Sequence, residues 1–137
     1  MGLILDSSVV VAGKRRRQSA DELLAAIRAS LGQDAIALST VSVIELEHGT
    51  WRARDAAQAA NRQRFFDDLF AAVPTYPLTF SIARRAARID GESRRRGVVI
   101  PFQDLVIGVT ALEFDYAVAT TNVRHFRMVP GLVVKQM

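Results

Sequence analysis

Three carboxylates and one amide stand in this chain where side chains can meet at one end of a sheet. Asp6 directly follows the apolar run at residues 3–5, and Glu45 and Asp104 each lie in the first turns of a predicted helix. Asn122 follows a later apolar run. Because ligands of open parallel sheets bind beyond the carboxyl ends of the strands, we expect these four side chains to lie near one another.

Carboxylates that gather on half-buried faces repel one another unless they become protonated or share a cation. The chain has no cysteine and only two histidines, so its oxygen ligands favour a hard ion, Mg²⁺ or Mn²⁺. Such an ion orients a phosphodiester, activates a water and stabilises the leaving oxygen. The residue types therefore predict metal-dependent hydrolysis of a phosphodiester.

Each of the four residues also has a simpler structural explanation. Asp6 could cap the helix that follows it, and Glu45 completes a capping box that begins at Ser42. Asp104 could complement the dipole of its helix, and Asn122 could be a turn residue in a left-handed conformation. For each residue alone, these explanations stay open.

The simpler explanations weaken when the residues are taken together. Asp6 directly follows three apolar residues. Glu45 shares its predicted helical face with two apolar residues and a histidine, namely Val41, Ile44 and His48. Carboxylates on such faces favour the shared site.

The segments that must position these residues alternate between short apolar runs and longer stretches of helical period. This alternation is typical of an α/β protein with a parallel sheet. We predict strands at residues 3–5, 35–38, 117–120 and 132–134, and at most a short one at 73–76. We predict helices at residues 18–31, 39–54, 56–72, 79–96 and 101–115, and a turn at 121–122. The chain shows no linker or internal repeat, which favours one domain over residues 1–137.

The composition narrows the function classes. Lysine and arginine number 18 against 14 acidic residues, and the net charge of +4 favours a polyanionic partner. The absence of cysteine excludes a disulfide scaffold, a cysteine zinc site and a thiol nucleophile. The N-terminal apolar run is too short for a signal peptide or a membrane span, so we expect a cytoplasmic protein with no membrane segment.

Four motifs follow one another along the chain: LILDSSV at residues 3–9, VSVIEL at 41–46, IPFQD at 100–104 and ATTNVRHF at 119–126. Each motif is weak alone, but the ordered set covers nearly the whole chain. The set strongly resembles the PIN-domain nucleases, and within them the VapC-type toxins of bacterial toxin–antitoxin systems. The resemblance implies a three-layer α/β/α sandwich, a Mg²⁺-dependent endoribonuclease for single-stranded RNA, inhibition by a VapB-type antitoxin, and a homodimer.

The family's site residues carry over to this chain position by position. The resemblance places the family's acidic ligands at Asp6, Glu45 and Asp104. It places the family's supporting hydroxyls at Ser7 and Thr120. The family's fourth acidic position is Asn122, a neutral amide that contributes no charge. We therefore expect one well-bound ion, with Asn122 contacting it through water or orienting the nucleophile.

Two arginine clusters are candidates for RNA contact. Arginine forks suit phosphate, and single-stranded RNA binding combines such charge with stacking on aromatic side chains. The candidates follow Asp6 or precede the helix of Asp104, and they are Arg15, Arg16, Arg94, Arg95 and Arg96. The alternative is that both clusters are solvated helix faces.

Other functions are less well supported. A haloacid-dehalogenase-type phosphatase needs an aspartate where this chain has Ser8, and a phospho-acceptor receiver needs a late lysine, for which the chain offers only Lys135. The stronger alternative is a PIN-like domain that binds RNA or a partner protein without cleaving. Asn122 gives this alternative some weight.

Overall fold

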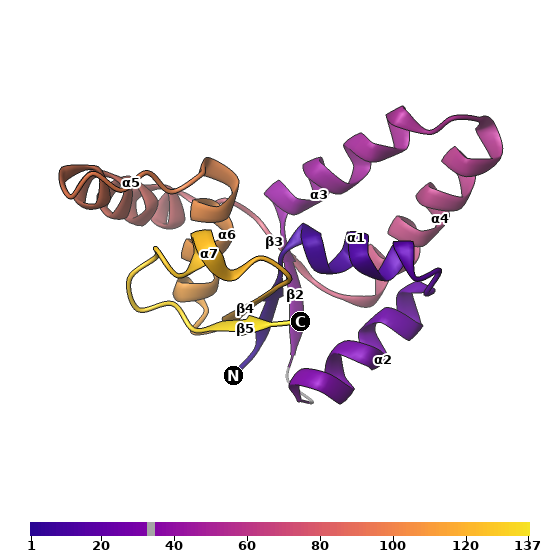
Figure 1. Cartoon of the computed structure of the whole chain (residues 1–137), viewed down its shortest axis with the longest axis horizontal. Coiled ribbons are helices and arrows are strands. Elements are labelled where there is room, and N and C mark those ends of the chain that lie inside the picture. Colours follow the sequence, from indigo (N-terminus) through magenta and orange to yellow (C-terminus); the bar gives the residue numbers. More distant parts are fainter. Residues whose placement is uncertain (33–34) are drawn as a thin grey trace.

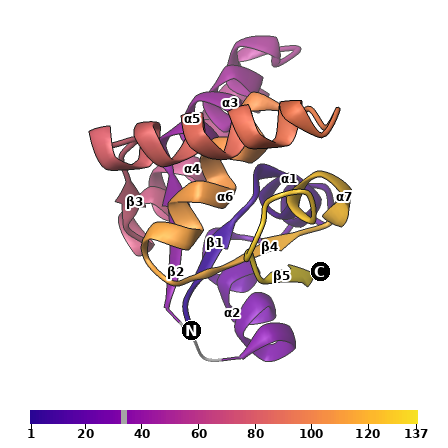
Figure 2. The ribbon, with the colours of Figure 1, turned by 90° about the vertical axis from the view of Figure 1, so that its left-hand side faces the viewer.

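A five-stranded sheet in the order β3-β2-β1-β4-β5 runs through the centre of the molecule (Figures 1 and 2). The computed structural model describes residues 1–32 and 35–137. The strands are β1 Leu3–Leu5, β2 Ile36–Ser39, β3 Thr75–Tyr76, β4 Ala117–Thr120 and β5 Val134–Gln136. All four neighbouring pairs are parallel. The carboxyl ends of the strands therefore share one edge, as the location of a common site requires.

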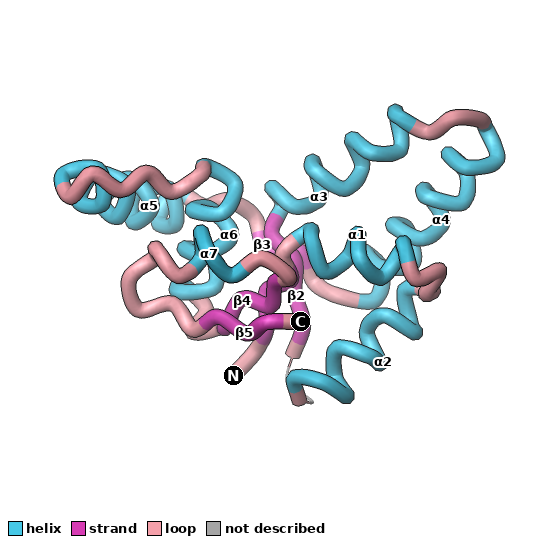
Figure 3. The backbone as a smooth tube through the Cα atoms, in the orientation of Figure 1, coloured by secondary structure: helices cyan, strands magenta, loops and turns pink. Residues whose placement is uncertain are grey.

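Helices cover both faces of this sheet (Figure 3). They are α1 Ser7–Arg15, α2 Ala20–Leu31, α3 Thr40–His48, α4 Ala56–Ala72, α5 Phe80–Arg95, α6 Phe102–Glu113 and α7 Val123–Phe126, and a 3₁₀ turn, η1, spans Gly49–Arg52. Leu3 and Leu5 of β1 pack into the core cluster shared with α1, α2 and α4. Ile4, between them, packs on the opposite face with Ile107 of α6 and Phe126 of α7. The predicted three-layer α/β/α sandwich is confirmed.

Burial on both faces explains why β1 is an uninterrupted apolar run. Leu3, Ile4 and Leu5 are each 0% exposed. Strands of parallel sheets covered by helices on both sides are apolar at every position rather than at alternate ones. Full burial of each such side chain contributes roughly 1.5–3 kcal/mol, so the strand that carries Asp6 at its end is among the most firmly held parts of the fold.

Side-chain caps fix the starts of four helices, of which α3 is capped by the Ser39 hydroxyl. Ser19 and Glu22 form a reciprocal capping box at α2, with bonds of 3.1 and 3.0 Å. The Asp55 carboxylate accepts the Gln58 N–H at 2.7 Å at α4. The Thr79 hydroxyl caps α5, as predicted from the sequence. Each cap satisfies an amide that the helix itself leaves unpaired.

The helix α1 was not predicted, because its sequence favours a strand more than a helix. It opens on two serines and three valines, which are poor helix formers, and it contains Gly13. Tertiary packing overrides this preference: Val9 and Val10 are buried, and a Cβ on Gly13 would lie 2.7 Å from a methyl of Leu23. Close contact between α1 and α2 therefore determines this helix.

Three further boundaries differ from prediction. The helix predicted over residues 39–54 ends at His48 and continues as η1. The turn at 121–122 leads into the unpredicted short helix α7. The last strand lies at Val134–Gln136 rather than 132–134, because β5 pairs with β4 from Val134 onward. The strand β5 lies at the edge of the sheet, where an apolar run is not required.

Within the described residues, no helix combines the length and apolar composition that crossing a bilayer requires.

Candidate active site

Asp6 stands at the carboxyl end of the central strand β1. Its N–H donates to the Ala119 carbonyl at 2.9 Å, which extends the β1–β4 ladder through this residue. The side chain is 7% exposed. Asp6 occupies the N-cap position of α1, but its carboxylate does not cap that helix. The capping explanation for Asp6 is therefore wrong.

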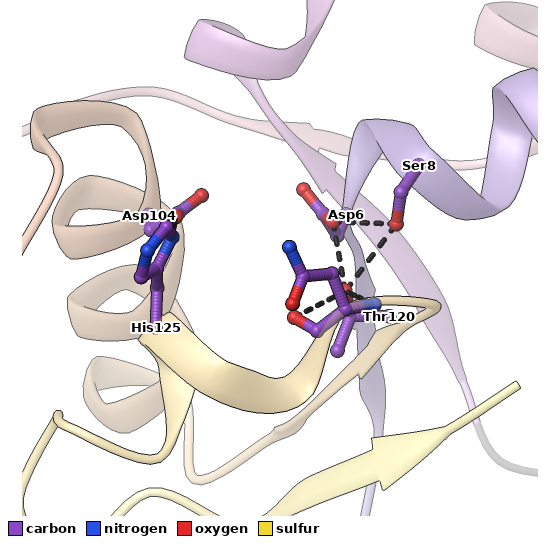
Figure 4. Close-up of polar contacts among 6 residues, drawn as sticks. Asp6, Ser8, Asp104, Thr120 and His125 are labelled. Carbon is purple, nitrogen blue, oxygen red and sulfur yellow. Dashed lines mark hydrogen bonds and ion pairs between the residues drawn. The ribbon is translucent and has the colours of Figure 1, made fainter.

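Two hydroxyls orient the Asp6 carboxylate instead (Figure 4). Ser8 Oγ and Thr120 Oγ1 both donate to Oδ2 of Asp6, at 2.6 and 2.8 Å. The same hydroxyls accept from the N–H groups of Thr121 and Asn122, at 3.1 and 3.0 Å. The Ser8 and Thr120 hydroxyls can each donate their proton to Asp6, and the Asn122 carbonyl, 3.2 Å from Thr120 Oγ1, is a second acceptor for the Thr120 proton. Both bonds fall on Oδ2, so Oδ1 remains available for a ligand.

Asp104 faces Asp6 from the first turn of α6 (Figure 4). Its Oδ2 lies 2.9 Å from Nδ1 of His125, which is carried by α7. Burial raises the pKa of the Asp104 carboxyl, the Asp6 charge raises it further, and the contact with His125 opposes both. The helix dipole favours a carboxylate at this position. An interaction with the helix dipole alone, however, does not explain why the Asp104 carboxylate is partly buried opposite the Asp6 carboxylate.

Glu45 approaches from α3. Burial raises the pKa of its carboxyl, the charges of Asp6 and Asp104 raise it further, and the Ser7 hydroxyl opposes this. Oε1 of Glu45 is buried without a hydrogen-bond partner among the described residues. A buried carboxylate oxygen without a partner is costly, so it indicates a ligand of opposite charge.

The two sequence-based explanations of Glu45 are both wrong in detail. The N-cap of α3 is Ser39, whose hydroxyl accepts the Val41 N–H, so no capping box begins at Ser42. The predicted apolar face is not buried either, since Ile44 is 71% exposed. The surroundings of Glu45 are set by the end of β1 and by α6, which carry Asp6 and Asp104, rather than by its neighbours on α3.

The three carboxylates thus influence one another across three elements distant in sequence. In the part of the chain that is described, no three acidic or histidine side chains are already close enough to form a metal chelate. Without a cation, mutual repulsion favours such separation. Their donor chemistry, carboxylate oxygens with Glu45 Oε1 unpartnered, fits a hard divalent ion.

Asn122 lies beside this group rather than within it. It forms the N-cap of α7 with φ −126°, so the left-handed turn explanation is wrong. Its side chain is exposed, and its backbone N–H donates to Thr120 Oγ1. The backbone of Asn122 therefore helps orient Asp6 through Thr120.

Sequence reasoning missed the contribution of Ser8 and did not link His125 to Asp104. The hydroxyl that bonds Asp6 belongs to Ser8, while Ser7 acts on Glu45. The serine two residues after Asp6 was a visible signal, because the start of a helix turns that side chain back toward the strand end. Nothing local linked His125 to Asp104, which is 21 residues away.

The two arginine clusters lie in different surroundings. Arg15 lines a pocket of about 770 Å³ that Glu45 also lines. Arg16 is exposed at the end of α1. Arg94 pairs with Asp90 at 3.0 Å and lines a separate pocket between α5 and α6. The last two predicted candidates, also exposed, are Arg95 and Arg96.

Known proteins share this fold. The PIN domain family matches residues 3–132. "Ribonuclease VapC" from Rickettsia bellii is 25% identical over 134 residues, which cover 98% of this chain and 95% of the relative. "Ribonuclease VapC1" from Rickettsia felis is 26% identical with the same coverage. A chain in the crystal structure of VapBC2 from Rickettsia felis, bound to a DNA fragment from their promoter, has a TM-score of 0.83 at 18% identity, and the match covers 99% of this chain and 98% of that one. The chain therefore belongs to the PIN-domain family, and within it resembles the VapC-type proteins.

Proposed function

We propose that this chain is a Mg²⁺-dependent endoribonuclease that cleaves single-stranded or loop RNA. One observation carries the proposal: Glu45 Oε1 is buried without a partner among the described residues, and the charges of Asp6 and Asp104 add to the burial that raises the pKa of Glu45. This arrangement is unfavourable in itself and becomes favourable with a divalent cation. The relatives named as ribonucleases support the same conclusion.

Asp6, Glu45 and Asp104 would hold Mg²⁺ or Mn²⁺. When bound, the ion supplies Lewis-acid stabilisation of phosphodiester charge and makes water a stronger nucleophile. Ser8 and Thr120 hold Oδ2 of Asp6 by donating to it. The supporting hydroxyl predicted at Ser7 acts on Glu45. These hydroxyl contacts fix the direction in which the Asp6 and Glu45 carboxylates present their remaining oxygen to the ion.

Asn122 replaces a fourth negative charge with an exposed amide. Three carboxylates and one divalent ion together carry a net charge of −1. A second divalent ion would have no further carboxylate to bind. We therefore propose one well-bound ion, with the Asn122 amide contacting it through water or orienting the nucleophile.

The similarity to VapC proteins supports a biological role for this activity. We propose that residues 1–137 form a single domain that acts in the cytoplasm as the toxin of a type II toxin–antitoxin pair. Its partners would be an RNA substrate, a VapB-type antitoxin and a second copy of the chain. The matched crystal structures of VapBC proteins support the antitoxin.

Cleavage of an RNA panel tests the enzymatic proposal. The purified chain is incubated with hairpin and single-stranded RNAs in Mg²⁺, in Mn²⁺, and in chelator, with Asp6→Asn as the matched control. Cleavage by the parent chain that requires metal and is lost in the control is the expected result. Absent or metal-independent cleavage would instead favour a non-cleaving PIN-like module that binds RNA or protein, which Asn122 also suits.

A further inference from the structure

The pocket of about 770 Å³ that Glu45 lines is formed mainly by residues of α1, α3, η1 and α4. The helices α3 and α4 form an arch at the upper right of Figure 1. Its lining contains six cationic side chains and two carboxylates. The whole chain carries a net charge of +4, so this one lining accounts for all of it and the rest of the chain is balanced. Such concentration of charge beside the carboxylates marks an anion-binding surface.

The pocket's two carboxylates offset only part of this charge. Glu45 belongs to the acidic site, and Asp55 is committed to the cap of α4 and to Arg54 at 3.5 Å. Within residues 1–32 and 35–137, Lys14 and Arg52 form no ion pair with a carboxylate. On α5, Arg85 pairs with Glu113 and Arg94 pairs with Asp90.

Lys14 is held in place at the floor of the pocket. Its ammonium lies 4.9 Å from the centroid of the Phe66 ring and 5.5 Å from that of Phe65. Burial, and then the charge of Arg62, lower the pKa of Lys14. Arg62 is itself fixed, because its guanidinium donates to the Gly49 carbonyl at 2.6 Å. The side chains of Lys14 and Arg62 are therefore both held in position and repel each other. Neither forms an ion pair with a carboxylate among the described residues.

An exposed aromatic side chain, that of Trp51, is the sequence neighbour of a residue that lines the pocket. Trp51 is 88% exposed and lies between Thr50 and Arg52 on η1, with Arg52 and Gly49 both lining the pocket. Sites for single-stranded nucleic acid combine a cationic groove for the backbone with aromatic faces on which bases stack. An acidic peptide would satisfy the charge but gives no role to an exposed indole.

We propose that this pocket is a binding track for single-stranded RNA, in which Lys14 and Arg52 contact backbone phosphates and Trp51 stacks on a base. The track leads from Glu45 along the pocket that residues of α1, α3, η1 and α4 form, so it positions the strand on one side of the scissile phosphate. This inference rests on the proposed nuclease function and names the surface that delivers its substrate. It assigns the principal RNA contact to this pocket rather than to Arg94–Arg96.

The test measures binding in an Asp6→Asn background, so that no probe is cleaved. The probe is a labelled 12-nucleotide oligouridine, titrated by anisotropy at several KCl concentrations. Trp51 is the single tryptophan of the chain, so all tryptophan emission comes from this residue and reports on its surroundings. The variants are Lys14→Gln, Arg52→Gln and Trp51→Leu, with Arg88→Gln, an exposed arginine of α5, as the matched control.

Oligouridine is expected to quench Trp51 emission. Lys14→Gln and Arg52→Gln should each weaken binding about five- to tenfold near 0.1 M KCl, and each should lower the slope of log Kd against log salt by about 0.7. Trp51→Leu should weaken binding about fivefold, and Arg88→Gln should change it less than about twofold. Lys14 packs on two rings, so Arg52 and Trp51, which are exposed, keep the test independent of folding.

Parent-like binding by Arg52→Gln and Trp51→Leu would overturn the track. So would a polyglutamate peptide that quenches Trp51 and displaces the RNA at equal concentration, because the pocket would then be a peptide site. If the unsubstituted chain cleaves RNA while the pocket variants bind RNA normally, the track fails and the nuclease stands. If binding depends on the pocket but the unsubstituted chain never cleaves, the track stands and the nuclease fails.

Discussion

His125 Nδ1 lies 2.9 Å from Asp104 Oδ2, and this contact ties the short helix α7 to the first turn of α6. The imidazole is 32% exposed and the carboxylate 22%. The contact occupies one oxygen of Asp104 and leaves the other directed toward Asp6 (Figure 4). His125 therefore acts as a positioning residue for Asp104.

Replacing His125 with phenylalanine should lower the affinity for divalent metal. The ring remains but the donor is lost, so the Asp104 carboxylate can rotate away from the site. Loss of such an outer partner costs about 10–100-fold in metal affinity. Calorimetric titration of Mn²⁺ measures this, with His48→Phe, an exposed histidine of α3, as the control. Equal affinity in both variants would mean that His125 does not position Asp104.

Thr120→Val should destabilise the fold, because it removes a fully buried hydroxyl without changing the side-chain shape. Asp6 Oδ2 loses one donor, and the Asn122 N–H loses its acceptor. The expected cost is about 1–3 kcal/mol of unfolding free energy, measured by urea denaturation. Thr121→Val is the matched control, since Thr121 is exposed and only its backbone bonds Ser8. Equal midpoints for the two variants would contradict this role.

Asp6→Asn should abolish RNA cleavage and leave the fold intact. The amide oxygen can still accept from Ser8 and Thr120, while repulsion with Glu45 and Asp104 is relieved. We expect activity to fall by more than the roughly 100-fold typical of losing an outer partner. Gel assays with Mg²⁺ measure cleavage, and circular dichroism checks the fold. Asp104→Asn should behave alike; retained turnover in both would reject the site assignment.

The parts of this site that sequence predicts are those set by local position. Asp6 ends a run of three apolar residues, which had to be a strand buried on both faces. Asp104 follows Pro101 at a helix start, and the parallel sheet brings such starts and ends to one edge. Local pattern therefore sufficed to bring Asp6 and Asp104 to the same edge of the sheet.

The parts that sequence did not predict depend on contacts between distant segments. Ser8 bonds Thr120 and Asp6 because β1 and β4 are neighbours, a pairing across more than a hundred residues. Ile44 was expected on a buried face and is exposed, since nothing packs on that side of α3 in the described residues. The helix α1 forms through burial of Val9 and Val10 despite poor helix propensity.

Glu45→Gln should stabilise the metal-free protein at neutral pH and much less so in acid. The folded state raises the pKa of Glu45, first by burial and then through the charges of Asp6 and Asp104. A carboxyl with a raised pKa binds its proton more tightly in the folded state. Its favourable contribution is therefore complete below the ordinary glutamate pKa of about 4.3 and is lost as pH rises through the folded value.

The parent should therefore lose stability relative to Glu45→Gln between about pH 4 and pH 7. Urea denaturation in chelator at the two pH values measures the difference, with Glu47→Gln, on the same helix, as the control. Saturating Mg²⁺ should reverse the order at pH 7, because an ion that binds only the folded parent stabilises it in proportion to the logarithm of its concentration. If Glu45→Gln were more stable than the parent at every pH, or remained so in saturating Mg²⁺, Glu45 would not be a carboxylate that binds a cation at this site.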